Sequence, residues 1–198
     1  FGVDVSGDED TVIYQPIYKD AALAGAVFEI RAAEDIITPD GTLRYAKGEV
    51  VDTITTGADG FAKSKEIYLG KYEVQEIKAP YGYVISKDIH SVELIYAGQN
   101  VSVTETATSF YNERQKATLS MQKVLETNDL FEIGNNGEIK NVVFGLYAAE
   151  ELVSTSGTSI PADGLIEVIT FDENGLATVK TDLPLGSYYV KEIATDEH

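Results

Sequence analysis

Hydrophobic and polar residues alternate along residues 72–80, the pattern of a β-strand with one buried face. Tyr72, Val74 and Glu76 fall on the apolar face, so a carboxylate ends a row that should point into the core. Similar patterns, bounded by turn residues, predict further strands at residues 11–18, 23–30, 50–55, 61–68, 91–96 and 101–111. Many short strands at regular spacing favour an all-β sandwich.

An internal repeat organises the chain. The interval from Phe28 to Glu76 equals the interval from Phe144 to Glu192, which again ends an alternating row. The copies are offset by 116 positions, and at this offset residues 32–35 match residues 148–151 and residues 69–72 match residues 185–188. A repeat of this length indicates two copies of one domain and not a single large fold.

We expect two tandem β-sandwich domains, residues 1–113 and residues 114–198, because a chain of 198 residues suits two domains of ordinary size. The linker between them is short and has no Gly/Ser tract. The first copy continues well past Glu76, as far as Asn112, whereas the chain ends at His198, soon after Glu192. The second domain is therefore expected to lack its last strands.

Charge and composition limit the function. The chain has 33 acidic and 15 basic residues, and its net charge of -18 argues against a nucleic-acid partner. No apolar run has the length of a membrane helix, so no membrane contact is expected of this fragment. Cysteine is absent, which excludes disulfides, and the acidic residues 1–10 lack the oxygen spacing of an EF-hand. We expect neither a metal nor a cofactor.

A lysine and an asparagine also fall on apolar strand faces, Lys123 near the start of the second copy and Asn112 at the end of the first. Desolvation favours a neutral lysine amine and a protonated glutamate. Beside such a glutamate, an amine can attack the carboxamide carbon, release ammonia and leave an isopeptide cross-link, a reaction that proximity accelerates. Glu76 and Glu192 are the candidate promoters of this reaction, and Asn112 and Lys123 are candidate cross-linked residues.

The motifs resemble those of Cna protein B-type (SpaA-type) domains, the prealbumin-like sandwich modules of Gram-positive pilins and surface adhesins. The first copy carries the resemblance at residues 25–28, 72–80 and 110–112, and the second at residues 143–147, 183–188 and 189–193. The resemblance implies an Ig-like sandwich with Greek-key connections. It also implies a first-strand lysine bonded to a last-strand asparagine beside the glutamate. By this resemblance, Glu76 and Asn112 belong to the first site, and Lys123 and Glu192 to the second.

Both copies depart from the family pattern. The second has no asparagine partner for Lys123 within the chain. In the first, Gly7 stands where the offset places the counterpart of Lys123, and Lys19 lies much closer to the next strand than Lys123 does. The missing lysine is then either Lys19 or one that precedes the first residue. The alternative is that one or both domains lack the bond and Glu76 is a hydrogen-bonded core carboxyl.

The resemblance implies a structural spacer in the stalk of a bacterial pilin or adhesin, extracellular and anchored to the cell wall in the full-length protein. Neighbouring domains of that protein are the expected partners. The alternative is an adhesin head that binds host matrix protein or glycan, for which residues 36–48 and 153–163 offer long loops. Enzymatic turnover is not expected, because nucleophile and nucleotide motifs are absent and His90 and His198 are the sole imidazoles.

Overall fold

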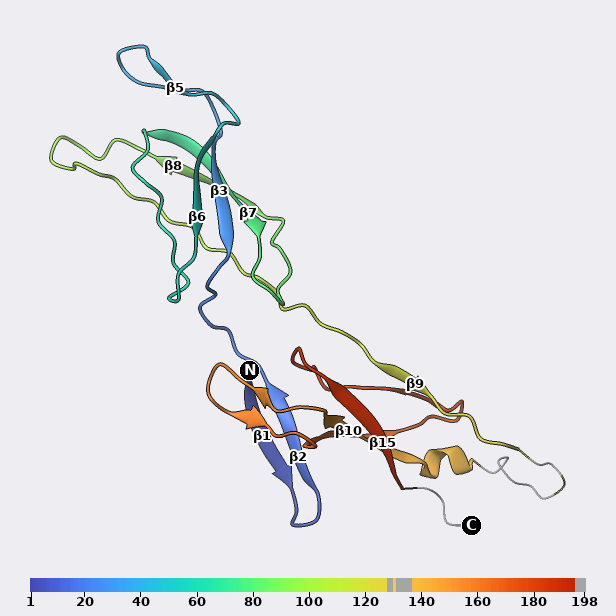
Figure 1. Cartoon of the computed structure of the whole chain (residues 1–198). Coiled ribbons are helices and arrows are strands. Elements are labelled where there is room, and N and C mark those ends of the chain that lie inside the picture. The colour runs from blue at the N-terminus through green and yellow to red at the C-terminus, as the bar shows by residue number, and fades with distance from the viewer. Residues whose placement is uncertain (128–129, 131–136, 195–198) are drawn as a thin grey trace. The chain divides into compact units, whose positions relative to one another are not determined.

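A computed structural model describes residues 1–127, 130 and 137–194 and shows an all-β chain (Figure 1). The strands are β1 (Gly2–Gly7), β2 (Val12–Ile17), β3 (Val27–Ala32), β4 (Ile36–Ile37), β5 (Leu43–Tyr45), β6 (Val50–Thr55), β7 (Gly70–Lys78), β8 (Ile89–Leu94), β9 (Ser120–Gln122), β10 (Val143–Ala148), β11 (Leu152–Val153), β12 (Ser159–Ile160), β13 (Leu165–Thr170), β14 (Leu176–Thr178) and β15 (Tyr188–Ala194). One 3-10 helix, η1 (Glu138–Asn141), is present among the described residues, and no described helix is long and apolar enough to span a membrane.

The chain divides into two compact units. We call residues 20–115 the continuous unit, and residues 1–19 together with the described residues from Lys116 onward the split unit.

The continuous unit is built on an antiparallel sheet with the strand order β6-β3-β7-β8. Burial alternates along β3 and β7, as the sequence pattern predicts, and Tyr72, Val74 and Glu76 all lie on the buried face. Phe28 on β3 lies opposite Glu76 on β7. The register therefore sets an aromatic ring beside the inward carboxylate.

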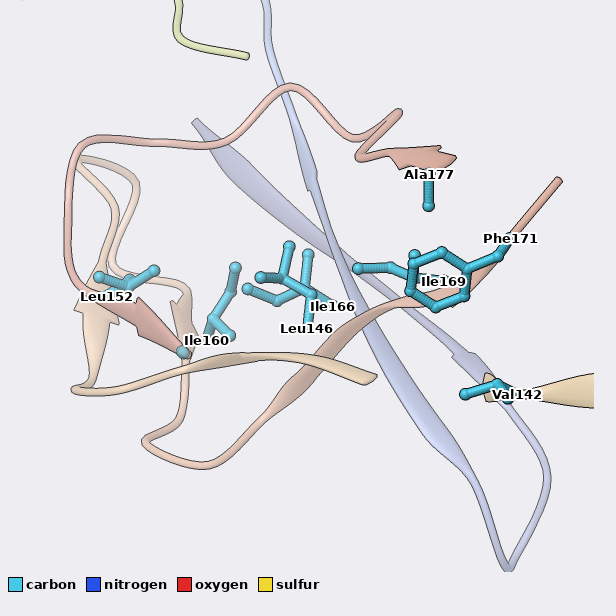
Figure 2. Close-up of a cluster of buried hydrophobic side chains, with 9 residues drawn as sticks. Val142, Leu146, Leu152, Ile160, Ile166, Ile169, Phe171 and Ala177 are labelled. Atoms are coloured by element: carbon cyan, nitrogen blue, oxygen red, sulfur yellow. The ribbon is translucent and has the colours of Figure 1, made fainter. Parts of the chain in front are cut away.

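The split unit repeats this arrangement. Its sheet has the order β1-β2-β13-β10-β15, in which β10 pairs antiparallel with β13 and β15, and Phe144 lies opposite Glu192. A second, two-stranded sheet pairs β9 with β14. Figure 2 shows the buried core, in which Leu146, Ile166 and Ile169 of the large sheet gather with Ala177 of β14.

The structure differs from the expected division of the chain, 1–113 and 114–198, in the placement of residues 1–19. The hairpin β1–β2 belongs to the split unit, where β2 pairs in parallel with β13 and Ile13 is the partner of Leu165. In Figure 1 the blue hairpin accordingly lies among strands of residues 143–194. Val3 and Tyr14 pack against the core of that unit. The sequence pattern predicted strand β2 but carried no information on which sheet it joins.

Two expected strands, residues 61–68 and 101–111, are not strands in the structure. Their side chains still contribute to the core, since Ile67 and Phe110 pack against the buried cluster of the continuous unit. In the split unit the counterpart of residues 61–62 is paired, because β14 bonds to β9. Residues 61–68 have no hydrogen-bonded partner strand among the described residues of the continuous unit, and for this reason they do not form a β-strand.

Both units share a close approach at a glycine, the first residue of β7 in one unit and the second residue before β15 in the other. A Cβ atom on Gly70 would lie 2.5 Å from Cδ1 of Ile36, and one on Gly186 would lie 2.4 Å from Cδ2 of Leu152. Ile36 and Leu152 are themselves 116 positions apart, as the two glycines are. Glycine is therefore required at both positions so that an aliphatic side chain can lie directly against the strand.

The placement of residues 1–19 is tested by deleting them and following amide hydrogen exchange. Exchange in β13 should accelerate by roughly tenfold or more, equal to ~1.4 kcal/mol of lost local stability, because β13 loses its parallel partner. Exchange in β6, which lies in the continuous unit, should not change. Acceleration in β6 with β13 unaffected would assign the hairpin to the continuous unit instead.

The fold also predicts a loss of stability at alkaline pH. Burial raises the pKa of Tyr72 to about 12, and its hydroxyl donates to the Tyr68 carbonyl at 2.5 Å. A raised folded-state pKa contributes stability below the unfolded value, about 10, and this contribution is lost as pH rises through 12, on the order of 2 to 3 kcal/mol. The free energy of unfolding, taken from urea denaturation at each pH between 9 and 12, should therefore fall less steeply with pH for Tyr72→Phe than for the wild type. Tyr81→Phe is the control, since Tyr81 is 92% exposed and should leave the slope unchanged.

Candidate functional site

The site of the continuous unit is centred on Glu76, whose side chain is buried with 1% exposure. Its Oε2 atom accepts a hydrogen bond from Nδ2 of Asn112 at 2.6 Å and another from the backbone N–H of Ser86 at 2.5 Å. Nδ2 of Asn112 also donates to the carbonyl of Val84 at 3.0 Å. The amide is therefore held between a carboxylate oxygen and a backbone carbonyl.

The surroundings of this carboxylate are apolar and aromatic. The rings of Phe28 and Phe110 lie 4.8 Å apart, and His90 stacks on Phe110 at 4.0 Å. The second carboxylate oxygen of Glu76, Oε1, is buried and has no hydrogen-bond partner among the described residues. A buried polar atom without a partner costs about 1–3 kcal/mol, so Oε1 marks a position suited to one more donor.

The arrangement places a proton carrier at the correct atom for amide exchange. Glu76 contacts the nitrogen of Asn112 that would leave as ammonia, and a protonated carboxyl there can deliver its proton to that nitrogen. The contact is made by Nδ2 of Asn112 and not by its carbonyl oxygen. Among the described residues, no lysine is hydrogen-bonded to or ion-paired with Glu76, and Lys19 belongs to the split unit.

The split unit holds a different pair. Nζ of Lys123 lies 3.1 Å from Oε2 of Glu192, and the two side chains are 30% and 32% exposed. The ammonium also lies 5.7 Å from the ring centroid of Phe144, within the range of a cation–π contact. No asparagine amide is bonded to Glu192 among the described residues of this unit.

The structure thus brings together the pairs named from the sequence, Glu76 with Asn112 and Lys123 with Glu192, and each unit holds two members of a three-residue site. Their role in a cross-link stays a prediction. Sequence reasoning missed the backbone N–H of Ser86, because a backbone donor has no sequence signature. Of the two histidines, His90 bonds through Nδ1 to the Thr108 hydroxyl at 2.5 Å, and residue 198 lies outside the described residues.

Residues 17–108 match the family model SpaA, described as a prealbumin-like fold domain. The chain is 24% identical over 139 residues to the trypsin-resistant surface T6 protein of Streptococcus pyogenes serotype M6, covering 69% of this chain and 25% of that protein.

Solved structures are also similar. The Bacillus anthracis TIE protein matches with 25% identity and a TM-score of 0.54, over 89% of this chain and 26% of that chain. A streptococcal ancillary pilin matches with 20% identity and a TM-score of 0.34, over 88% of this chain and 50% of that chain. The chain therefore spans about a quarter of the T6 and TIE proteins.

The Glu76–Asn112 contact is tested by Asn112→Ala. This change leaves Oε2 of Glu76 with the Ser86 N–H as its remaining donor, so the free energy of unfolding should fall by about 1–3 kcal/mol. Urea denaturation followed by tyrosine fluorescence measures the change. Asn100→Ala, at an exposed turn of the same unit, is the matched control and should be neutral. Equal effects of the two substitutions would contradict a structural role for the contact.

Proposed function

We propose that the chain is a spacer of a Gram-positive surface protein and that its continuous unit forms an isopeptide cross-link, because residues 17–108 match the SpaA model of prealbumin-like domains. The proposal places Glu76 as proton carrier and Asn112 as the cross-linked amide. The lysine comes from a strand outside residues 20–115. In the split unit, Lys123 and Glu192 take the corresponding roles, and the asparagine comes from outside the described residues.

One observation carries the proposal, and it is the incomplete environment of Glu76. Its Oε1 atom is buried without a donor among the described residues. In the split unit, Lys123 directly follows β9, the strand that pairs with β14. The counterpart of β14 in the continuous unit begins at Phe61 and has no ladder partner in the part of the chain that the structure describes. A strand that paired with residues 61–63, as β9 pairs with β14, would bring a lysine at its end toward Oε1 of Glu76, as Lys123 lies beside Glu192.

The reaction balances without a further reagent. The neutral lysine amine attacks Cγ of Asn112, Glu76 gives its proton to Nδ2, and the Cγ–Nδ2 bond breaks to release ammonia. A proton from the attacking nitrogen returns to Glu76, and a Cγ–Nζ amide remains. Such a bond constrains the unfolded chain as a disulfide does, on the order of 4 kcal/mol for a domain-sized loop. The chain has no cysteine, so a cross-link of this kind would take the place of a disulfide.

The spacer role is supported by the relatives and by the surface charge. The T6 relative is named as a trypsin-resistant surface protein, and a cross-link that suppresses local unfolding is a physical route to protease resistance. A net charge of -18 keeps an extracellular surface soluble and self-repelling. The expected partners are neighbouring domains or subunits of the same surface assembly, and the expected location is the cell wall.

The missing lysine is tested by supplying it in trans. A synthetic peptide of residues 118–124, which includes β9 and Lys123, is added in excess to the chain. Intact-mass spectrometry under denaturing conditions should show an adduct equal to chain plus peptide minus one ammonia. Asn112→Ala and Glu76→Ala should abolish the adduct.

Asn100→Ala in the chain is the control for Asn112→Ala and should leave the yield unchanged. A peptide in which Lys123 is replaced by arginine should give no adduct, because guanidinium is not a nucleophile at neutral pH. Absence of any adduct, when the peptide is also tethered to the chain through a flexible linker, would contradict the cross-linking site. The spacer role would then rest on the family relationship alone.

A further inference from the structure

The split unit contains an open cleft that the proposed cross-link does not use. Its volume is about 630 Å³. It lies between residues 10–14, at the turn and second strand of the hairpin β1–β2, and residues 161–165, which lead into β13. Tyr14 and Tyr147 line it with Asp10 and Asp163. The cleft exists because residues 1–19 join this unit, since they form one of its walls.

Asp163 holds an unfavourable backbone conformation in this cleft. Its φ of 62° is the sole positive value for a non-glycine residue among those described. Residues 161–164 form a tight turn closed by the bond from Gly164 N–H to the Pro161 carbonyl, and Asp163 N–H donates to Ala148. The continuous unit has the same turn, closed by the bond from Glu49 N–H to the Ala46 carbonyl. There Gly48, with a φ of 83°, takes the position of Asp163, and its N–H donates to the Ala32 carbonyl.

The comparison shows that glycine satisfies this turn, so the aspartate is not needed for the fold. A strained residue that the fold does not require indicates a function for its side chain. Oδ1 of Asp163 accepts a hydrogen bond from the Tyr189 hydroxyl at 3.0 Å. Oδ2 has no hydrogen-bond partner among the described residues.

Aromatic rings extend the site over the outer face of the sheet. The rings of Tyr147 and Tyr189 are stacked, with centroids 5.1 Å apart and planes 12° apart. Tyr147 lies against Gly145, where a Cβ atom would be 2.5 Å from its ring. Glycine at this position therefore allows the ring to lie where it does.

None of these features is repeated in the continuous unit. At the 116-residue offset, Gly145 corresponds to Glu29, Tyr147 to Arg31 and Tyr189 to Glu73. Arg31 and Glu29 form an ion pair there. The aromatic pair and Asp163 are therefore features of the split unit that the continuous unit does not have at the matching positions.

We propose that the cleft of the split unit binds a neutral pyranose sugar, with the ring of Tyr147 against the apolar C–H face of the sugar and Asp163 accepting hydrogen bonds from its hydroxyls. The face of an aromatic ring attracts C–H groups, and a carboxylate oxygen accepts hydrogen bonds from adjacent hydroxyls. Asp10 and Asp163 disfavour anionic sugars. This site is independent of Glu76 and Asn112, so it does not rest on the cross-link.

Saturation-transfer difference NMR on the whole chain tests the site with methyl glucoside, methyl galactoside, methyl mannoside and diacetylchitobiose as probes. At least one probe should show transfer at millimolar concentration, strongest at the C–H groups of one sugar face. Tyr147→Ala should weaken binding by roughly tenfold. Asp163→Gly should weaken binding similarly while thermal stability is kept or raised, because glycine relieves the backbone conformation.

Arg31→Ala, at the counterpart of Tyr147 in the continuous unit, is the matched control and should leave binding unchanged. A negatively charged sialyl sugar should bind more weakly than the neutral probes. The proposal is overturned if no neutral probe shows transfer, or if transfer persists in both Tyr147→Ala and Asp163→Gly. It is also overturned if a lysine-rich peptide binds the cleft more tightly than every sugar, because the site would then recognise a cation.

Discussion

The register between β3 and β7, repeated between β10 and β15, is the constraint on which the other features depend. It sets Phe28 opposite Glu76 and Phe144 opposite Glu192. Because side chains alternate across a strand, a slip of one residue would move each glutamate to the outer face and expose its apolar neighbours. Gly70 at the start of β7 and Gly186 just before β15 oppose such a slip, since an aliphatic side chain lies directly against each glycine.

The two units complete the same three-strand core in different ways. In the continuous unit, β8 covers the outer edge of β7. In the split unit, the hairpin β1–β2 covers the outer edge of β13, while β15 pairs with β10 alone among the described strands. An open edge presents unpaired N–H and C=O groups, so covering it contributes stability wherever the covering strand comes from. Residues 1–19 therefore belong to the unit formed by residues from Lys116 onward, although residues 20–115 follow them directly in the chain.

Buried and exposed positions of the repeat have diverged to different extents. A glutamate opposite a phenylalanine occurs in both units, buried at Glu76 and 32% exposed at Glu192. The outer face is not constrained by core packing, and there an arginine and glutamate of one unit correspond to the stacked Tyr147 and Tyr189 of the other. The strained Asp163 belongs to the same divergent surface. The outer-face residues that differ between the units are therefore not determined by packing of the core.

The sequence by itself determined the strands with strong alternation, the 116-residue repeat and the inward direction of Glu76, because these follow from the period of two along a strand. The apolar face of its strand marked Asn112 as a candidate, and the family resemblance implied that Asn112 lies beside Glu76, a contact that the structure contains. The tertiary structure alone decided that residues 1–19 complete the split unit, since edge pairing depends on contacts between segments far apart in the sequence, such as Ile13 and Leu165. It likewise decided that Oε1 of Glu76 lacks a donor among the described residues and that residues 61–68 form no ladder with them, because both depend on which strand lies alongside.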